Sequence, residues 1–404
     1  MKVALFVSSY TPETGGSYTF EHQLLDTLLK SYAESKHTFV LYASNRPGSK
    51  YRLDPTLQTV PTQITAKQEV KSQILGLARN IAYGLSDSIG NYLVERWHKQ
   101  YTLNSFKTDR IDIILSLTPN CPTMEYPYIT TVWDLQHKLQ SYFPEVSASG
   151  EWDKREKFYA KMLSRAAFII TGTETGKAEI QRFYQVPAER IRVIPFFTPQ
   201  LALTDPPDDR DISIAYNLPD RYLFYPAQFW PHKNHVNLLL AIKCLKEKYN
   251  LALPLVLVGS DKGNESYVKS IVQELDLSAQ VSFLGFVPQA DMAPLYRNAF
   301  ALIFLSFFGP DNLPPLEAMA LGCPVIAANV SGAAEQLGDA AVLVDPKHPE
   351  EIAAAINTLF TDSILRQNLI DSGLKRANQW TTKDYVREIF TLLDDFEAIG
   401  RCWE

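Results

Sequence analysis

The sequence predicts an α/β protein built as two lobes, each with a parallel sheet. Short β-branched runs alternate with longer amphipathic runs, which is the order typical of parallel strands covered by helices. The chain has 404 residues and 46% hydrophobic content, which is enough for two domains with separate cores. A stretch rich in proline and acid at 195–211, PFFTPQLALTDPPDDRD, breaks both periodicities. We place the hinge within it, at 201–211.

Six runs in each half of the chain have the composition of strands. In the first lobe, residues 1–200, the expected strands are 2–8, 38–43, 111–117, 128–132, 168–171 and 191–194. In the second lobe, residues 212–383, they are 222–226, 255–258, 281–284, 301–305, 324–328 and 341–344. Ligands of parallel sheets bind at the carboxyl ends of the strands, so we expect the ligand between the lobes.

Composition excludes several classes of function. The formal charge is -6, from 39 basic and 45 acidic residues, which argues against binding of nucleic acid. The N-terminal run MKVALFV has the composition of a strand rather than of a signal peptide, and no run reaches the roughly 18 apolar residues of a membrane span. Four widely spaced cysteines predict neither disulfides nor a zinc site, and hence a reducing, cytoplasmic location: Cys121, Cys244, Cys323 and Cys402.

Residues 66–107 have a helical pattern with basic and apolar positions, which leaves two interpretations open. One is weak docking on a membrane surface, at the inner face of the membrane. The other is a pair of amphipathic helices with solvated outer faces. We favour the second because Glu69, Asp87 and Glu95 are interspersed among the basic residues.

The most informative segment is 307–325, FFGPDNLPPLEAMALGCPV. Asn312 can cap a helix, Pro314 or Pro315 suits the first turn, and Glu317 is expected within that turn. A helix start of this kind attracts anions. The alternative is a helix of the core in which Glu317 only complements the helix dipole.

Ser306 to Ile326 resembles the donor-site signature of the retaining, family 4 glycosyltransferases of GT-B fold, the glycosyl transferases group 1. The resemblance implies two Rossmann-like lobes facing across a cleft, with a C-terminal helix, 384–404, crossing back to the first lobe. It also implies that Glu317 holds the donor ribose and that the helix start at Asn312 and Leu313 faces the donor. The first glutamate of the family's pair falls on Gly309, and Asp311 in the same turn could meet a sugar hydroxyl.

Two further loops resemble phosphate-binding segments of that family. Gly15 and Gly16 follow the first strand and precede a helix that Ser17 could cap; because GxGxxG is lacking, no dinucleotide cofactor is indicated. Lys233 matches the lysine that meets the diphosphate, and Gln228 falls where the family usually has an arginine. His232, His235 or a residue of the other lobe could compensate for the missing charge.

Three more sites follow from the resemblance. Asp134 and His137 lie in a segment where relatives carry His-Asp-Leu, and we predict that His137 contacts the transferred sugar or the acceptor while Asp134 orients it. A surface histidine in a loop is the alternative.

The backbone around Phe286 and Val287 is expected to read the nucleobase. Asp209 and Asp211 form a lone DxD, which we interpret as solvated linker because the family resembled needs no metal.

The resemblance thus implies an enzyme: a retaining, metal-independent hexosyltransferase of mannose or glucose type. It would move the sugar from a nucleoside-diphosphate donor to a hydroxyl of a glycan or lipid-linked acceptor, with no cofactor. Two alternatives are kept. One is an epimerase or phosphorylase-like enzyme of the same fold, and the other is a protein that binds a nucleotide sugar without catalysis.

Overall fold

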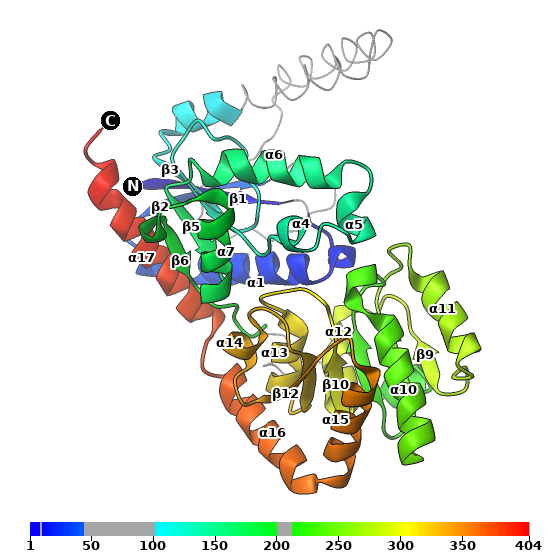
Figure 1. Ribbon diagram of the computed structural model, residues 1–404. Coiled ribbons are helices and arrows are strands. Elements are labelled where there is room, and N and C mark those ends of the chain that lie inside the picture. Colours follow the sequence, from blue (N-terminus) through cyan, green and yellow to red (C-terminus); the bar gives the residue numbers. More distant parts are fainter. Residues whose placement is uncertain (9, 44–101, 200–211, 404) are drawn as a thin grey trace. The chain divides into compact units, whose positions relative to one another are not determined.

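A computed structural model describes residues 1–8, 10–43, 102–199 and 212–403 (Figure 1). The predicted hinge, the Asp209–Asp211 pair and most of the segment 66–107 lie outside the described residues. No helix in the described ranges is both long enough and apolar enough to cross a membrane.

The first sheet has six parallel strands in the order β2-β1-β3-β4-β5-β6. Its strands are β1 (Lys2–Val7), β2 (Thr38–Ala43), β3 (Ile113–Ser116), β4 (Tyr128–Thr131), β5 (Phe168–Thr171) and β6 (Ile191–Val193). Strands β3, β4 and β5 are buried along their whole length, as expected for a parallel sheet covered on both faces. All six predicted strands of this sheet are confirmed.

The second sheet also has six parallel strands, in the order β12-β11-β10-β7-β8-β9. They are β7 (Leu223–Pro226), β8 (Leu255–Val258), β9 (Val281–Phe283), β10 (Ala301–Phe304), β11 (Val325–Ala328) and β12 (Ala341–Val344). Strands β8, β10 and β11 are buried throughout and β7 is buried up to Tyr225, whereas the edge strands β9 and β12 are partly exposed. These six strands were predicted correctly as well.

Helices join successive strands, and the side chains discussed below lie on these helices and on the turns that lead into them. Those used below are α1 (Gly16–Ser31), α4 (Gln136–Leu139), α5 (Pro144–Ser147), α6 (Glu151–Leu163), α7 (Glu174–Tyr184), α10 (His235–Tyr249), α11 (Glu265–Glu274), α12 (Gln289–Asn298), α13 (Leu313–Ala320), α14 (Ala333–Leu337), α15 (Pro349–Thr361), α16 (Ser363–Ala377) and α17 (Thr382–Gly400). Helix α10 packs against α15, and α13 against α16.

The chain divides into two compact units. Unit 1 comprises Met1–Thr131, Met162–Ile170 and Ile389–Glu404, and unit 2 comprises Val132–Lys161 and Thr171–Glu388. This division does not follow a single boundary near residue 200, and the predicted domain limits stay a prediction. The second half of α17 belongs to unit 1, where Phe390 contacts Phe39 with ring centroids 5.9 Å apart. The predicted return of the C-terminal helix to the first lobe is therefore confirmed.

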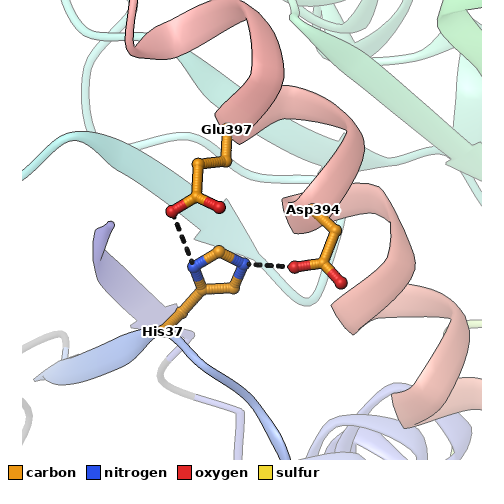
Figure 2. A group of neighbouring side chains, drawn as sticks. All are labelled: His37, Asp394 and Glu397. Carbon is orange, nitrogen blue, oxygen red and sulfur yellow. Dashed lines mark hydrogen bonds and ion pairs between the residues drawn. The ribbon is translucent and has the colours of Figure 1, made fainter.

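An ion network fixes the end of α17 within unit 1 (Figure 2). His37 Nε2 lies 3.0 Å from Asp394 Oδ1, and Glu397 Oε1 lies 4.0 Å from His37 Nδ1. Among the described residues this is the group whose ligand types could suit a metal ion. However, Lys36 Nζ already bonds Asp394 at 3.0 Å and Glu397 at 2.8 Å. Because a resident ammonium compensates both carboxylates, we interpret the group as a structural ion network.

Candidate active site

Five of the eleven predicted donor-binding residues lie on two turns at one edge of the second sheet, and Leu313 and Glu317 lie on the helix that follows one of these turns. Strands β7 and β10 are parallel neighbours, so the turns that follow them leave from the same edge. Phe307 N donates to the carbonyl of His232 at 2.8 Å, and Asn234 Nδ2 donates to the carbonyl of Leu305 at 3.1 Å. These bonds hold the β7–α10 turn against the β10–α13 turn.

The β7–α10 turn fixes Lys233 directly before a helix. A short 3-10 helix, Pro231–Lys233, is followed by Asn234 in the left-handed conformation, φ 60° and ψ 35°. Asn234 Nδ2 also donates to the carbonyl of Pro346 at 2.8 Å, and the Tyr225 hydroxyl donates to the carbonyl of Lys233. The backbone of Lys233 is thus anchored at the N-terminus of α10, where the helix dipole is positive.

The ammonium of Lys233 has little to neutralise it. Its Nζ donates to Ser306 Oγ at 3.4 Å and lies 5.4 Å from the ring centre of Phe304. Burial lowers the pKa of Lys233 to about 8, although the carboxylates of Asp134 and Glu145 act in the opposite direction. Within the described part of the chain Lys233 forms no ion pair. A cation without a counterion at a helix start is prepared to bind an anion.

Gln228 offers no replacement for the arginine of the family. Its Oε1 accepts from Trp230 Nε1 at 3.0 Å, and its Nε2 donates to Ser260 Oγ at 3.2 Å. Both ends of the amide are therefore engaged. Gly259 packs so tightly on this backbone that a Cβ would lie 2.3 Å from the carbonyl oxygen of Ala227.

The β10–α13 turn explains why Gly309 carries no side chain. Gly309 has φ +133°, and an added Cβ would lie 2.6 Å from the side chain of Asn312. Asn312 Nδ2 donates to the carbonyl of Gly309 at 2.8 Å, and Asn312 N donates to Gln336 Oε1 at 3.1 Å. Asn312 occupies the N-cap position, but its side chain does not cap the helix. The predicted capping by Asn312 is wrong, because its amide closes the preceding turn instead.

Asp311 points away from that cap and packs against Gly172. A Cβ on Gly172 would lie 1.5 Å from Asp311 Oδ2, so only glycine leaves room for this carboxyl group. Burial, followed by the nearby carboxylate of Glu335, raises the pKa of Asp311 to about 7. Glu335 itself accepts from the backbone N of Glu174, at the start of α7, at 2.6 Å. Asp311 is therefore partly protonated near neutral pH and can both donate and accept a hydrogen bond.

Glu317 is placed differently from the prediction. Helix α13 begins at Leu313, so Glu317 is its fifth residue and the first turn contains no acidic residue. The predicted position in the first turn is wrong, since the helix begins before both prolines. The carboxylate is held by Tyr296 of α12, whose hydroxyl donates to Glu317 Oε2 at 2.7 Å. Burial raises the pKa of Glu317, while the bond from Tyr296 opposes that rise.

His137 is buried, with none of its side-chain surface exposed. Its Nε2 lies 2.9 Å from the Tyr184 hydroxyl and 3.3 Å from Glu156, and its ring stacks on Tyr159. The alternative of a surface histidine is wrong, because α4 places this side chain in the core of unit 2. Contact between His137 and a sugar stays a prediction, and this geometry does not support it.

Asp134 does not orient His137. Its Oδ1 accepts from Arg155 at 2.6 Å and from the backbone N of Gln136 at 3.0 Å. Burial opposes ionisation, but Arg155 outweighs it and lowers the pKa of Asp134. The prediction that Asp134 orients His137 is therefore wrong, because Asp134 is paired with Arg155 of α6 instead.

Phe286 and Val287 lie between β9 and α12 at the carboxyl end of β9. Phe286 is half-exposed and Val287 is buried. Gly285, with φ +66°, accepts from Gly259 N at 2.9 Å, which anchors the segment to the loop after β8. Reading of the nucleobase by this backbone stays a prediction.

Gly15 and Gly16 belong to unit 1. Gly15 is the N-cap residue of α1, with φ 79° and ψ -131°, and Gly16 is the first residue of the helix. The expected capping by Ser17 is wrong, because the N-cap residue is Gly15, two residues earlier. The sequence reasoning missed Glu21, which is fully buried and whose Oε1 accepts from Ser8 N at 2.7 Å. The one sequence signal for the burial of Glu21 is its position among the apolar residues of α1.

Sequence comparison matches part of unit 2 to a known family. Residues 209–376 match the family model of the glycosyl transferases group 1. This segment contains Lys233, the β10–α13 turn and Glu317. Residues 209–376 belong to the glycosyl transferases group 1.

A curated relative of this group is the O-antigen chain mannosyltransferase B of Escherichia coli. It is 30% identical over 233 residues, which cover 56% of this chain and 60% of that protein. The chain therefore spans less than two thirds of the length of this relative.

Solved structures extend the likeness to nearly the whole chain. Sucrose-phosphate synthase from Thermosynechococcus elongatus aligns with a TM-score of 0.69 and 19% identity over 98% of this chain and 99% of that one. Anabaena HepE, solved in complex with UDP-glucose, aligns with a TM-score of 0.62 and 18% identity over 98% and 100%. At such identities the likeness shows the fold alone, and it confirms the predicted GT-B fold.

Proposed function

We propose that this chain is a retaining, metal-independent glycosyltransferase. It would move a hexose of mannose or glucose type from a nucleoside-diphosphate sugar to a hydroxyl of a glycan or lipid-linked acceptor. The observation that carries the proposal is the Lys233 ammonium at the start of α10, which has no ion-pair partner among the described residues and lies inside the segment of the glycosyl transferases group 1. The similarity to a mannosyltransferase favours mannose as the sugar.

Lys233 would bind the diphosphate and stabilise the charge that grows on it as the nucleoside diphosphate departs. Loss of one such preorganised contact typically costs about 2.7–4 kcal/mol of barrier. The bond between the sugar C1 and the phosphate oxygen breaks while the acceptor oxygen bonds C1 on the same face. The departing phosphate takes the acceptor proton, so no separate base is required.

Glu317 would accept hydrogen bonds from the donor ribose. Tyr296 engages Oε2, and Oε1 has no partner among the described residues. The turn at Asn312 and Leu313 would present backbone N–H groups, and Asp311 would bond a sugar hydroxyl. The Gly15 and Gly16 backbone of unit 1 would approach a phosphate, as Gly15 adopts a positive φ.

Acceptor and location are parts of the same proposal. The O-antigen relative favours a glycan or lipid-linked acceptor. All four cysteines are free thiols in the structure, which fits a reducing compartment and the cytoplasm. Peripheral contact of residues 66–107 with the inner face of the membrane is the alternative that we do not favour, because acidic residues are interspersed among the basic ones.

The test combines donor binding with product analysis. Thermal unfolding is followed with GDP-mannose, UDP-glucose and other donors, with and without EDTA, for the wild type, Glu317→Ala and Lys233→Ala. Glu274→Ala and Lys375→Ala, on exposed positions of α11 and α16, are matched controls. Stabilisation by one donor that survives EDTA and is lost in both site variants supports the proposal. Unchanged donor turnover in both site variants contradicts it.

A second candidate is a protein that binds the nucleotide sugar without consuming it. Gly309 and Gln228, both uncharged, motivate it, since they replace two charged residues of the family. Tight donor binding without turnover in a broad acceptor screen would favour this candidate. Conversion of the donor without any acceptor would instead indicate an epimerase, and dependence on inorganic phosphate a phosphorylase. Proton NMR of the product decides retention, because the anomeric configuration must match that of the donor.

A further inference from the structure

One negative charge of a bound diphosphate has no evident partner in the β7–α10 turn. A nucleoside-diphosphate sugar carries one negative charge on each phosphate, whereas Lys233 supplies a single ammonium. Gln228 is uncharged and has both ends of its amide bound to Trp230 and Ser260. Another side chain of the same turn could supply a second cation.

His232 lies next to Lys233 and is held by a buried carboxylate. Glu145 Oε1, from α5, accepts from the backbone N of His232 at 3.2 Å and from ring Nδ1 at 2.5 Å. Burial acts to raise the pKa of Glu145, but the bonds from His232 outweigh it and the pKa is lowered. An ionised carboxylate can only accept, so Nδ1 carries a proton. Nε2 is left as the free ring nitrogen.

The imidazole is fixed in position as well as in tautomer. The ring of Phe143 lies 6.2 Å from that of His232 and 5.9 Å from that of Phe307, measured between centroids. Phe307 N donates to the carbonyl of His232, and Gln140 Nε2 donates to the carbonyl of Phe307 at 2.9 Å. The His232 side chain keeps 14% of its surface exposed, and Nε2 has no partner within the ranges that the structure describes.

We propose that His232, supported by Glu145, is the second cationic contact of the donor diphosphate and takes the place of the missing arginine. Once protonated, Nε2 would donate to a phosphate oxygen while Nδ1 donates to Glu145. Glu145 is a positioning residue, because it acts only through the imidazole. The inference rests on the proposed function, since it assigns a residue to the same donor site.

The charges around His232 make the contact dependent on pH. Burial, and then the ammonium of Lys233, lower the pKa of His232, whereas Glu145 and Asp134 raise it. The imidazole is therefore neutral at neutral pH before donor binds. The incoming phosphate charge favours the imidazolium, so binding takes up a proton from solvent at Nε2. Donor affinity should fall as the pH rises above the lowered pKa of free His232 and through its higher pKa in the complex.

Calorimetry of GDP-mannose and UDP-glucose in two buffers of different ionisation enthalpy measures this proton uptake. Intact donors are used because their diphosphate does not titrate near neutral pH. Near pH 7 Lys233, whose pKa is about 8, is mostly charged, and His235 is neutral because burial lowers its pKa to about 3. Asp311, whose pKa is about 7, contributes alike to every protein compared, so the proton uptake is compared between variants. The variants are His232→Gln, Glu145→Gln and His232→Gln combined with Gln228→Arg. His348→Gln, an exposed histidine before α15, is the matched control.

The wild type and His348→Gln should take up protons on binding donor. His232→Gln should take up fewer protons than the wild type and weaken binding by ~10- to 100-fold, the usual range for one hydrogen bond between charged groups. Gln228→Arg should restore affinity without restoring proton uptake, which a purely structural role of His232 would not allow. Glu145→Gln should shift the uptake to lower pH.

Two results would overturn the inference: proton uptake in His232→Gln as large as in the wild type, or affinity that Gln228→Arg does not restore. If the wild type binds none of the donors, the proposed function itself fails, and the inference fails with it. Thermal unfolding of each variant without donor identifies any loss of folding.

Discussion

Replacing Tyr296 by phenylalanine removes one hydroxyl and leaves its ring packed edge-on against Phe224, with centroids 5.0 Å apart. That hydroxyl donates to Glu317 Oε2 at 2.7 Å. A hydrogen bond to a charged group contributes about 1.5–3 kcal/mol to stability. For a domain of this size, 1 kcal/mol shifts the unfolding temperature by about 2–4 °C, so Tyr296→Phe should lower it by about 3–12 °C at a pH where Glu317 is ionised.

The pH dependence of this loss tests the reasoning more sharply than its size. Burial raises the pKa of Glu317, and Tyr296 opposes that rise because it stabilises the ionised form. As the pH falls through the raised pKa, the carboxyl becomes neutral and the bond weakens to about half its value. Differential scanning calorimetry at several pH values measures the difference between variant and wild type. Tyr267→Phe, on an exposed position of α11, is the control. An equal difference at every pH would refute the reasoning that the hydroxyl stabilises the ionised carboxylate.

The remaining predictions concern the same site. Lys233→Met should slow donor turnover by about 100- to 1000-fold, and wild-type turnover should decline above about pH 8 as the ammonium loses its proton, which initial rates across pH will show. Because the folded pKa of Asp311 is raised to about 7, its contribution to stability is full below the unfolded pKa and is lost as the pH rises through about 7. Asp311→Asn should therefore flatten the thermal stability between about pH 5 and 8, and an unchanged profile would contradict the burial of this carboxyl. Treatment with EDTA should leave turnover unchanged, whereas loss that added Mg²⁺ or Mn²⁺ restores would show that a metal is needed.

The strands were predictable because each is a short aliphatic run that both faces of a parallel sheet bury. Phe168–Thr171 and Leu255–Val258 show this local signal, and the structure has them as β5 and β8. The first residue of α13 was harder to predict from the sequence. Two prolines fit equally well at positions within the first turn, so the sequence could not decide whether the helix begins at Leu313 or later.

The partners of charged side chains were not predictable. Asp134 and His137 are three residues apart, which suggested that they act together, yet Asp134 pairs with Arg155 and His137 lies in the core beside Tyr184. Glu145 and His232 are separated by 87 residues, and no local pattern connects them. Spacing along the chain informs about neighbours in one helix or turn, but not about contacts between distant segments.

The sequence by itself determined the two parallel sheets, the family of residues 209–376 and the position of Lys233 at a helix start. Each of these follows from residues that are close in the chain, where local conformation and burial pattern dominate. Only the tertiary structure decided in which direction the pKa values of the site residues are shifted. The pKa of Lys233, Asp311 and Glu317 depends on burial and on side chains from other elements, which the fold brings within a few ångströms.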